Sequence, residues 1–246
     1  MRNKSIHSFI SNYSSLILIV FFAYFLRLYM YFVDPILSRD GIYYLYESMG
    51  IRVEDYLLLF GQQPPLFISI LTAFQKLGIS AELGALAVNI ICGSLLCVIV
   101  WMSCREMHFP KKICNLCAIL VAIHPELARN SHELQRETLY LFFSSIVIYC
   151  LTVASVSRRT SKRFNYTALL GVMGAMTVSF RYEGWELLLI ALIWFGFCDI
   201  FIKKRFFELI IKELLIVLGW TVSLLIILFV CQYPVNIYFQ NALGYL

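Results

Sequence analysis

The sequence predicts an all-α integral membrane protein, a polytopic transmembrane bundle of seven spanning helices. Of the 246 residues, 61% are hydrophobic and 14% are charged, whereas a soluble domain is typically about half apolar and about a quarter charged. Apolar runs recur that approach the roughly 20 residues needed to cross a bilayer. The basic residues lie between these runs, as the positive-inside rule requires. The net charge of +5 therefore does not indicate nucleic-acid binding.

The apolar runs define the predicted helices in chain order. The first run is too long for the apolar core of a signal peptide and lacks a cleavage site of small residues, so it is read as a retained helix. Two of the runs are shorter than the others and are bounded by charges. The predicted spans are 13–33, 84–103, 113–124, 137–156, 166–180, 184–202 and 209–231.

The basic clusters set the predicted topology. Two spans separate the second cluster from the third, and two more separate the third from the fourth, so those three share a side. The N-terminus joins them on the cytoplasmic side only if 65–79 does not cross, and Pro64, Pro65 and Lys76 favour an amphipathic helix at the interface for that stretch. The loop 34–82 then lies outside, as does the C-terminus. The clusters are Arg2 and Lys4; Arg105, Lys111 and Lys112; Arg158, Arg159, Lys162 and Arg163; and Lys203, Lys204 and Arg205.

The eight cysteines do not indicate a disulfide framework or a metal site. Most of them lie within apolar runs, where a cysteine acts as a small buried side chain. Cys114 and Cys117 form a CxxC pair, but no second pair accompanies them. A P-loop and a nucleophile motif are also absent from the sequence.

Under this topology the acidic residues gather in the outer loops. Ionisable groups near a membrane are costly, so they tend to be paired or functional. Asp40 follows the first helix and is a candidate general base or metal ligand; the alternative is a solvated loop acid. Arg181 is a candidate phosphate ligand, because a guanidinium fits phosphate oxygens. The alternative is an interfacial anchor that pairs with Glu183.

A second group of charges precedes the fourth span. Glu133, Arg136 and Glu137 are spaced to share one helical face and to pair internally; the alternative is a polar rim over a substrate cavity. Tyr44 and Glu183 join Arg136 and Glu137 as candidate residues of that rim. In the first span, Arg27 is predicted to snorkel outward.

Four segments in order resemble the GT-C glycosyltransferases, especially the bacterial protein O-mannosyltransferase-like and aminoarabinose-transferase-like members. The first resembles the family's acidic motif in the first outer loop, which leads into an amphipathic helix. The second resembles a further juxtamembrane helix, and the last two resemble the openings of the fourth and sixth helices. The segments are SRDGIYYLYES, GQQPPLFISILTAFQKLGIS, HPELARNSHELQRETLYLFF and FRYEGWELLLIALIW.

The resemblance implies transfer of a sugar from a polyprenyl-phosphate donor to a lipid, glycan or protein acceptor on the outer side, in a multi-pass protein of the bacterial inner membrane. By this likeness Asp40 is the catalytic acid of the first loop, acting as a base on the acceptor or holding a divalent metal. Arg181 meets the donor phosphate, and Glu137 opens the fourth helix. The whole chain, 1–246, is expected to be a single GT-C-like module.

Two departures qualify the resemblance. Gln63 stands where the aminoarabinose branch has lysine, which argues against that branch. Family members usually continue beyond the seventh helix, so a minimal, truncated or inactive chain is also to be considered. A non-catalytic assembly protein and a transporter of lipid or sugar are the alternative functions, although a transporter predicts charged or broken helices near the bilayer midplane.

Overall fold

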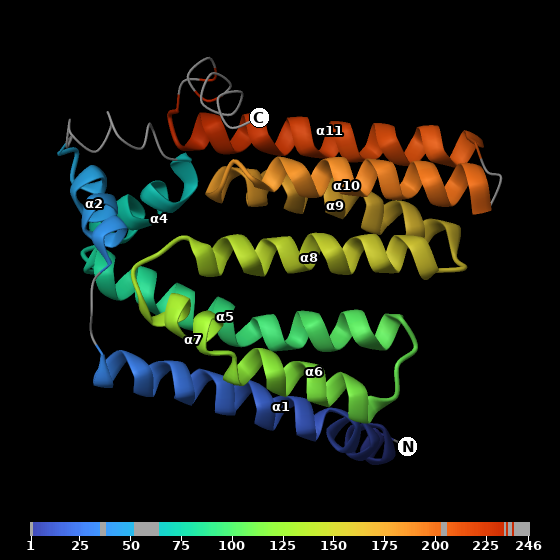
Figure 1. Cartoon of the computed structure of the whole chain (residues 1–246), viewed down its shortest axis with the longest axis horizontal. Helices are drawn as coiled ribbons and strands as arrows, with labels where there is room; N and C mark the ends of the chain where they lie inside the picture. The colour runs from blue at the N-terminus through green and yellow to red at the C-terminus, as the bar shows by residue number, and fades with distance from the viewer. Residues whose placement is uncertain are drawn as a thin grey trace.

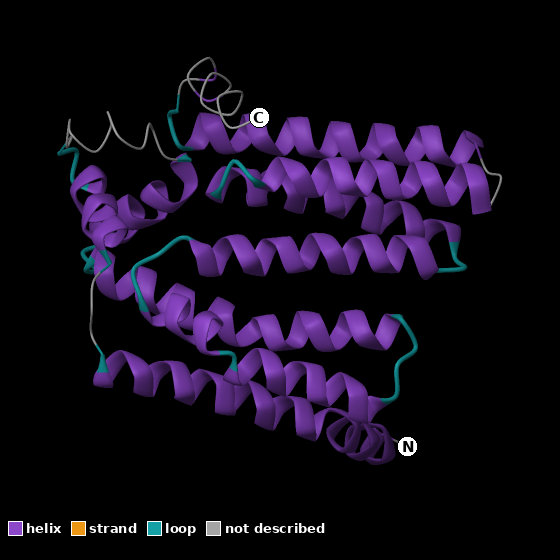
Figure 2. Cartoon of the chain, in the orientation of Figure 1, coloured by secondary structure: helices purple, strands orange, loops and turns teal. Residues whose placement is uncertain are grey.

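The computed structural model describes residues 2–34, 38–51, 64–202, 206–233, 235 and 238. Within these ranges the chain is helical apart from short connections, and Figure 2 shows no strand in the described part. This confirms the all-α prediction. The predicted residues Gln63, Lys203, Lys204 and Arg205 lie outside the described residues.

The helices follow the predicted apolar runs and extend most of them by a few residues. The element η1 differs from the α-helices, because it is a π-helical turn that continues α10. The elements are α1 (Arg2–Val33), α2 (Arg39–Ser48), α4 (Pro65–Lys76), α5 (Ala81–Glu106), α6 (Lys111–Ile123), α7 (Pro125–His132), α8 (Glu137–Val156), α9 (Thr160–Phe180), α10 (Gly184–Phe197), η1 (Cys198–Ile202) and α11 (Phe206–Val230).

The long helices lie side by side and alternate in direction (Figure 1). One end of the bundle carries α2, α4 and α7, and we call it the α2 end. The N-terminus and the loops 107–110 and 157–159 lie at the opposite end. We call this the basic end, because Arg105, Lys111, Lys112, Arg158 and Arg159 flank its loops.

Five helical segments in the described part are long and apolar enough to cross a membrane: Tyr13–Val33, Ala81–Glu106, Glu137–Val156, Gly184–Phe201 and Phe206–Val230. They match the five longest predicted runs. The two shorter predicted spans, α6 and α9, do not meet this criterion. With 13 residues, α6 reaches only about 20 Å at 1.5 Å per residue. The first turns of α9 are polar, with Lys162, Arg163 and Asn165 among them.

Prolines position the break between α6 and α7. Pro110 precedes the first turn of α6, where its missing N–H removes no hydrogen bond. Pro125 then ends α6, because the residue before a proline avoids the helical region. That residue, His124, is extended, and its Nδ1 accepts a hydrogen bond from the Leu127 amide at 3.4 Å. The short helix α7 therefore starts in a new direction over the α2 end.

Arg27 is fully buried, so the prediction that it snorkels outward is wrong. Its Nη1 donates to the Ala122 carbonyl at 3.3 Å and to the Ala23 carbonyl at 3.1 Å. Its Nε donates to Ser131 Oγ at 3.1 Å. The break after α6 frees carbonyls at that helix end, and these give the guanidinium internal partners. Arg27 thus joins α1 to both α6 and α7.

The central helix α9 packs against α8 on one side and α11 on the other. Glycines permit close approach to α11 and also to α10: a Cβ added at Gly171 would lie 2.4 Å from the Ile216 carbonyl oxygen of α11, and one at Gly174 would lie 2.5 Å from Leu188 Cδ2 of α10. Small residues at helix contacts are typical of membrane bundles, where close van der Waals packing drives association. The neighbours of α9 shield it, which explains why a helix in this position is less apolar than the other long helices.

We expect Gly171→Ala to destabilise the bundle, because the new methyl group meets a backbone oxygen that cannot move without shifting α11. Overpacking of this kind costs about 1–3 kcal/mol. Thermal unfolding of the purified protein in detergent should show a lower midpoint. Gly196→Ala is the matched control, since no atom lies within 4 Å of a Cβ added there, and a midpoint that falls equally in both variants would contradict the close-packing argument.

Candidate active site

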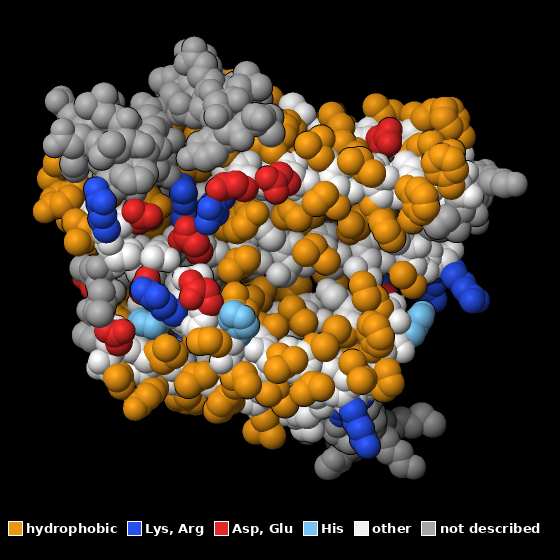
Figure 3. All heavy atoms as spheres, viewed as in Figure 1, with side chains coloured by type: hydrophobic (Ala, Val, Ile, Leu, Met, Phe, Trp, Pro, Cys, Tyr) orange, Lys and Arg blue, Asp and Glu red, His pale blue; other side chains and the backbone are white. Residues whose placement is uncertain are grey.

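Charged side chains gather at the α2 end, whereas hydrophobic side chains cover most of the bundle seen in the same view (Figure 3). Three connections meet there: the helix α2 after α1, the segment 133–136 before α8, and the turn 181–183 between α9 and α10. Each of the six residues predicted for the site lies in or next to one of these connections. They are Asp40, Tyr44, Arg136, Glu137, Arg181 and Glu183.

Arg181 is held by two carboxylates. Its Nη2 and Nε donate to Glu183 at 2.7 and 3.3 Å, and its Nη1 donates to Glu137 at 3.1 Å. Its guanidinium carbon also lies 5.5 Å from the ring centre of Tyr140, within range of a cation–π contact. The pairing with Glu183 that the sequence left as an alternative is therefore present, and Glu137 adds a second partner.

The pairing shifts the pKa values of both partners. Hydrogen bonding to Glu183 raises the pKa of Arg181 above its usual value. Burial is the largest single influence and acts to raise the pKa of Glu183. The hydrogen bonds from Arg181, a backbone hydrogen bond and the charges of Arg181 and Arg136 together outweigh burial and leave that pKa below its usual value. Both groups are consequently charged at neutral pH. The stabilisation from Glu183 is present above the ordinary pKa of a glutamate and is lost as the pH falls through the lowered value.

Arg136 has a different environment from Arg181. Its guanidinium carbon lies 5.8 Å from the ring centre of Tyr44. Its Nε and Nη1 are buried and have no hydrogen-bond partner among the described residues. Its charge helps to lower the pKa of Glu183, which places it close to the Arg181 pair. A buried donor without a partner costs about 1–3 kcal/mol, so a ligand that accepts these hydrogen bonds would bind favourably.

Asp40 lies in the first turn of α2, which Ser38 caps by accepting a hydrogen bond from the Gly41 amide at 3.0 Å. Gly41 brings α2 against the segment before α8, since a Cβ there would lie 2.7 Å from the Leu134 carbonyl oxygen. Asp40 and Tyr44 are four residues apart in one helix, so they lie on the same face. Asp40 is thus one turn from the ring that contacts Arg136.

The predicted internal pairing of Glu133, Arg136 and Glu137 is wrong. The chain is extended at Glu133, which ends α7, and α8 begins only at Glu137, so the three residues share no helical face. The buried Glu133 instead accepts hydrogen bonds from Arg129 and from Gln135, each at 2.7 Å. The break in the helix releases Arg136 and Glu137 toward α2 and Arg181.

Asn89 supports this segment and was not predicted. It is fully buried in α5, and its Nδ2 donates to the carbonyls of Glu133 at 3.2 Å and Gln135 at 2.8 Å. The sequence signal for this role was a side-chain amide inside an otherwise apolar run, because a buried polar group needs a hydrogen-bond partner. Asn89 fixes the backbone from which Arg136 projects.

A buried ion pair inside the bundle was also not predicted. Lys212 of α11 donates to Asp199 of η1, and both side chains are fully buried. Charged side chains are therefore present within the helices as well as at the α2 end. The sequence held a signal for this pair: an acid lies in one apolar run and a base in the next. Either charge alone would be costly in a membrane.

The acids around Arg181 do not assemble a metal-binding group. Glu137 and Glu183 accept hydrogen bonds from Arg181, and Glu133 does so from Arg129 and Gln135. Among the described residues, no group of three or more His, Cys, Asp or Glu side chains could hold a metal ion.

The described part of the chain is thus an all-helical bundle with two arginines and two carboxylates gathered at one end. The family model described as dolichyl-phosphate-mannose-protein mannosyltransferase matches residues 62–233. The chain belongs to that family, and it is a membrane glycosyltransferase of the GT-C kind. The match includes Arg136, Glu137, Arg181 and Glu183 but begins after Asp40. Comparisons with curated proteins and with solved structures gave no match.

Proposed function

We propose that the protein transfers a sugar from a polyprenyl-phosphate donor to an acceptor on the outer face of the membrane. The observation that carries this proposal is that two buried nitrogens of Arg136, beside the Arg181 cluster, have no hydrogen-bond partner in the described part of the chain. Before a ligand binds, the two arginines are balanced by Glu137 and Glu183. A phosphate would bring the acceptor oxygens that Arg136 lacks, and family membership makes a lipid-linked sugar the natural source of that phosphate.

Arg181 still has N–H groups that can donate hydrogen bonds to the same phosphate. An arginine side chain has five N–H groups, and the three hydrogen bonds to Glu183 and Glu137 use three of them. The remaining two are proposed to share the phosphate with Arg136. Two guanidinium groups would then neutralise the charge that develops on the leaving phosphate.

Asp40 is proposed as the general base. It takes the proton from the acceptor hydroxyl as the oxygen attacks the anomeric carbon of the sugar. The bond between that carbon and the donor phosphate oxygen breaks, and polyprenyl phosphate leaves with the electron pair. The position of Asp40, one turn from Tyr44 on the same face of α2, suits this role. If the reaction uses a divalent metal, Asp40 is also the proposed ligand, and loss of activity with a chelator would reveal that requirement.

The direct test supplies purified protein with radiolabelled polyprenyl-phosphate sugar and measures label in an acceptor. Label transfer in reconstituted vesicles supports the proposal. Movement of intact labelled lipid across the bilayer without transfer would instead indicate a transporter. Neither transfer nor movement would indicate a non-catalytic role.

The proposed topology has seven crossings, with α6 and α9 crossing alongside the five longer helices and 34–82 outside. The support is that the N-terminus and the loops 107–110 and 157–159 lie together at the basic end, opposite α2 and α4 (Figure 1). A reporter fused at Ser80 should then face outward, and one fused at Lys112 should face the cytoplasm. An inward reporter at Ser80 would mean that 65–79 crosses the membrane.

A further inference from the structure

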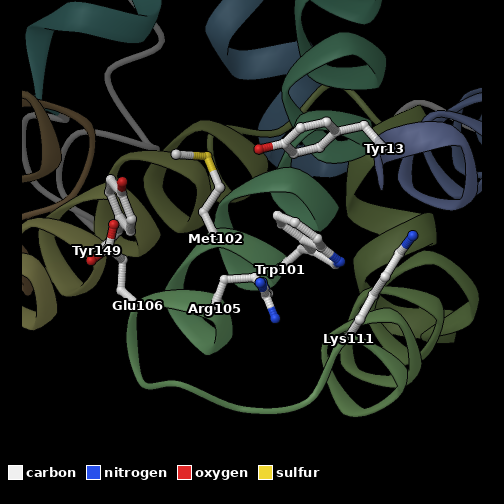
Figure 4. A pocket seen from close by; sticks show the side chains of 7 residues that line it. All are labelled: Tyr13, Trp101, Met102, Arg105, Glu106, Lys111 and Tyr149. Carbon is white, nitrogen blue, oxygen red and sulfur yellow. The ribbon is translucent and has the colours of Figure 1, made fainter. Parts of the chain in front are cut away.

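A pocket of about 260 Å³ lies at the basic end of the bundle, away from the candidate active site. Figure 4 shows Trp101 and Arg105 in its middle, with Tyr13 and Lys111 to one side and Glu106 and Tyr149 to the other. The pocket thus draws on α1, α5, α6 and α8. None of its residues takes part in the proposed transfer reaction.

The pocket carries net positive charge. The Arg105 guanidinium carbon lies 5.8 Å from the Trp101 ring centre, and its Nη1 donates to the Phe109 carbonyl at 3.3 Å. The acid at the pocket, Glu106, is already paired with Lys162 at 3.0 Å. Lys111 is the first residue of α6, whose N-cap makes no side-chain hydrogen bond. The unsatisfied amides and the dipole of a helix N-terminus add to the attraction for an anion.

An apolar groove of about 390 Å³ runs between α1 and α5. It continues the pocket along the same seam. On α1, Tyr13 of the pocket lies four residues before Ile17 of the groove. On α5, Met102 of the pocket lies four residues after Val98 of the groove. Residues four apart share a helix face, so the groove lies along the same faces of α1 and α5 as the pocket. The groove is lined by Leu16, Ile17, Val20, Phe21, Tyr24, Ile91, Ser94, Leu95 and Val98.

We propose that this seam is a binding site for an anionic phospholipid. The headgroup phosphate occupies the basic pocket between Arg105 and Lys111, and an acyl chain lies in the groove between α1 and α5. A soluble phosphate compound would use the pocket but would gain nothing from the groove, whereas a phospholipid uses both. The proposal rests on the membrane-embedded bundle and does not depend on the proposed transfer reaction.

The test uses delipidated full-length protein in a neutral detergent. Phosphatidylglycerol and phosphatidylcholine with the same acyl chains are titrated separately, and native mass spectrometry counts the bound lipid. We expect one phosphatidylglycerol to bind at least about tenfold more tightly than phosphatidylcholine. Both lipids carry a phosphate, but the choline ammonium cancels its charge and is repelled by Arg105 and Lys111, whereas phosphatidylglycerol keeps a net negative charge. Equal binding of the two lipids would overturn the proposal.

Matched variants distinguish lipid binding at this site from attraction of the lipid to positive surface charge in general. Arg105→Gln with Lys111→Gln should lower phosphatidylglycerol affinity about tenfold or more, because both proposed phosphate ligands lose their charge. Lys112→Gln with Arg158→Gln removes the same charge from exposed positions outside the pocket and should leave the affinity unchanged. Equal losses in the two double variants would overturn the proposal. Lys111→Gln alone gives the same comparison with Lys112→Gln if the first double variant fails to fold.

The groove is tested independently of the charges. Leu95→Trp should fill it and weaken phosphatidylglycerol binding several-fold, while the variant stays folded because Leu95 is 39% exposed. Free glycerol phosphate, which has the headgroup chemistry without chains, should compete poorly. Competition by glycerol phosphate at concentrations comparable to those of the lipid would show a site for a free phosphate compound and overturn the lipid assignment.

Discussion

Asp40→Asn is expected to abolish sugar transfer while expression and donor binding persist. The change keeps the size and hydrogen bonding of the side chain but removes the charge needed to accept a proton. General base catalysis is worth about a hundredfold to ten-thousandfold, so the rate of transfer in the reconstituted assay should fall by that factor. Donor affinity should change little, because the proposed phosphate ligands are Arg136 and Arg181.

Asp34→Asn is the matched control for this variant. Asp34 is an exposed carboxylate at the end of α1, where its amide donates to the Met30 carbonyl at 2.9 Å. It lies near Asp40 in sequence but outside α2, and its substitution should cost much less activity. Near-normal turnover in the Asp40→Asn variant would remove Asp40 from the mechanism and make Glu137 the next candidate.

Composition predicted the five longest helices because lipid-facing side chains must be apolar whatever their partners. The same reasoning is weaker for α9, which α8 and α11 shield from lipid, so its sequence need not be apolar throughout. It placed α6 to within two residues at its start and one at its end, but it did not give the reason for that end, which is fixed by Pro125 and by the contacts of Arg27 with carbonyls and Ser131. These features depend on tertiary packing, which the hydropathy of a single sequence does not reveal.

The charges of the candidate site were predictable from topology, whereas their partners were not. A turn as short as 181–183 allows Arg181 to reach Glu183 locally, and that pairing was one of the alternatives. Its second partner, Glu137, is 44 residues away in the chain. The contact between Arg136 and Tyr44 likewise requires α2 to pack on Leu134. Helical spacing misassigned Glu133, because it assumes a continuous helix where the chain is extended.

Substitutions of Arg136 and of Arg181 should differ in their effects on donor affinity and on thermal stability. Arg136→Ala is expected to weaken donor binding about tenfold to a hundredfold, because a charge-assisted hydrogen bond contributes about 1.5–3 kcal/mol. The thermal midpoint without donor should fall less than in Arg181→Ala, since Arg136 loses the contact with Tyr44 but its buried Nε and Nη1 have no described hydrogen-bond partner to lose. Donor affinity and thermal unfolding, measured on the same preparation, give the two readouts.

Arg181→Ala should lower both quantities, because it also leaves Glu137 and Glu183 without their shared cation. Arg181→Lys should restore the midpoint more than the affinity, since an ammonium can neutralise the acids but cannot supply the guanidinium fork. Arg129→Ala is the control for general charge at this end: Arg129 pairs with Glu133 and is 64% exposed, and donor affinity should not change. Unchanged donor affinity in both Arg136→Ala and Arg181→Ala would place the phosphate elsewhere and leave the arginines as anchors of the bundle, because a site that uses their unfilled donors cannot lose both without loss of affinity.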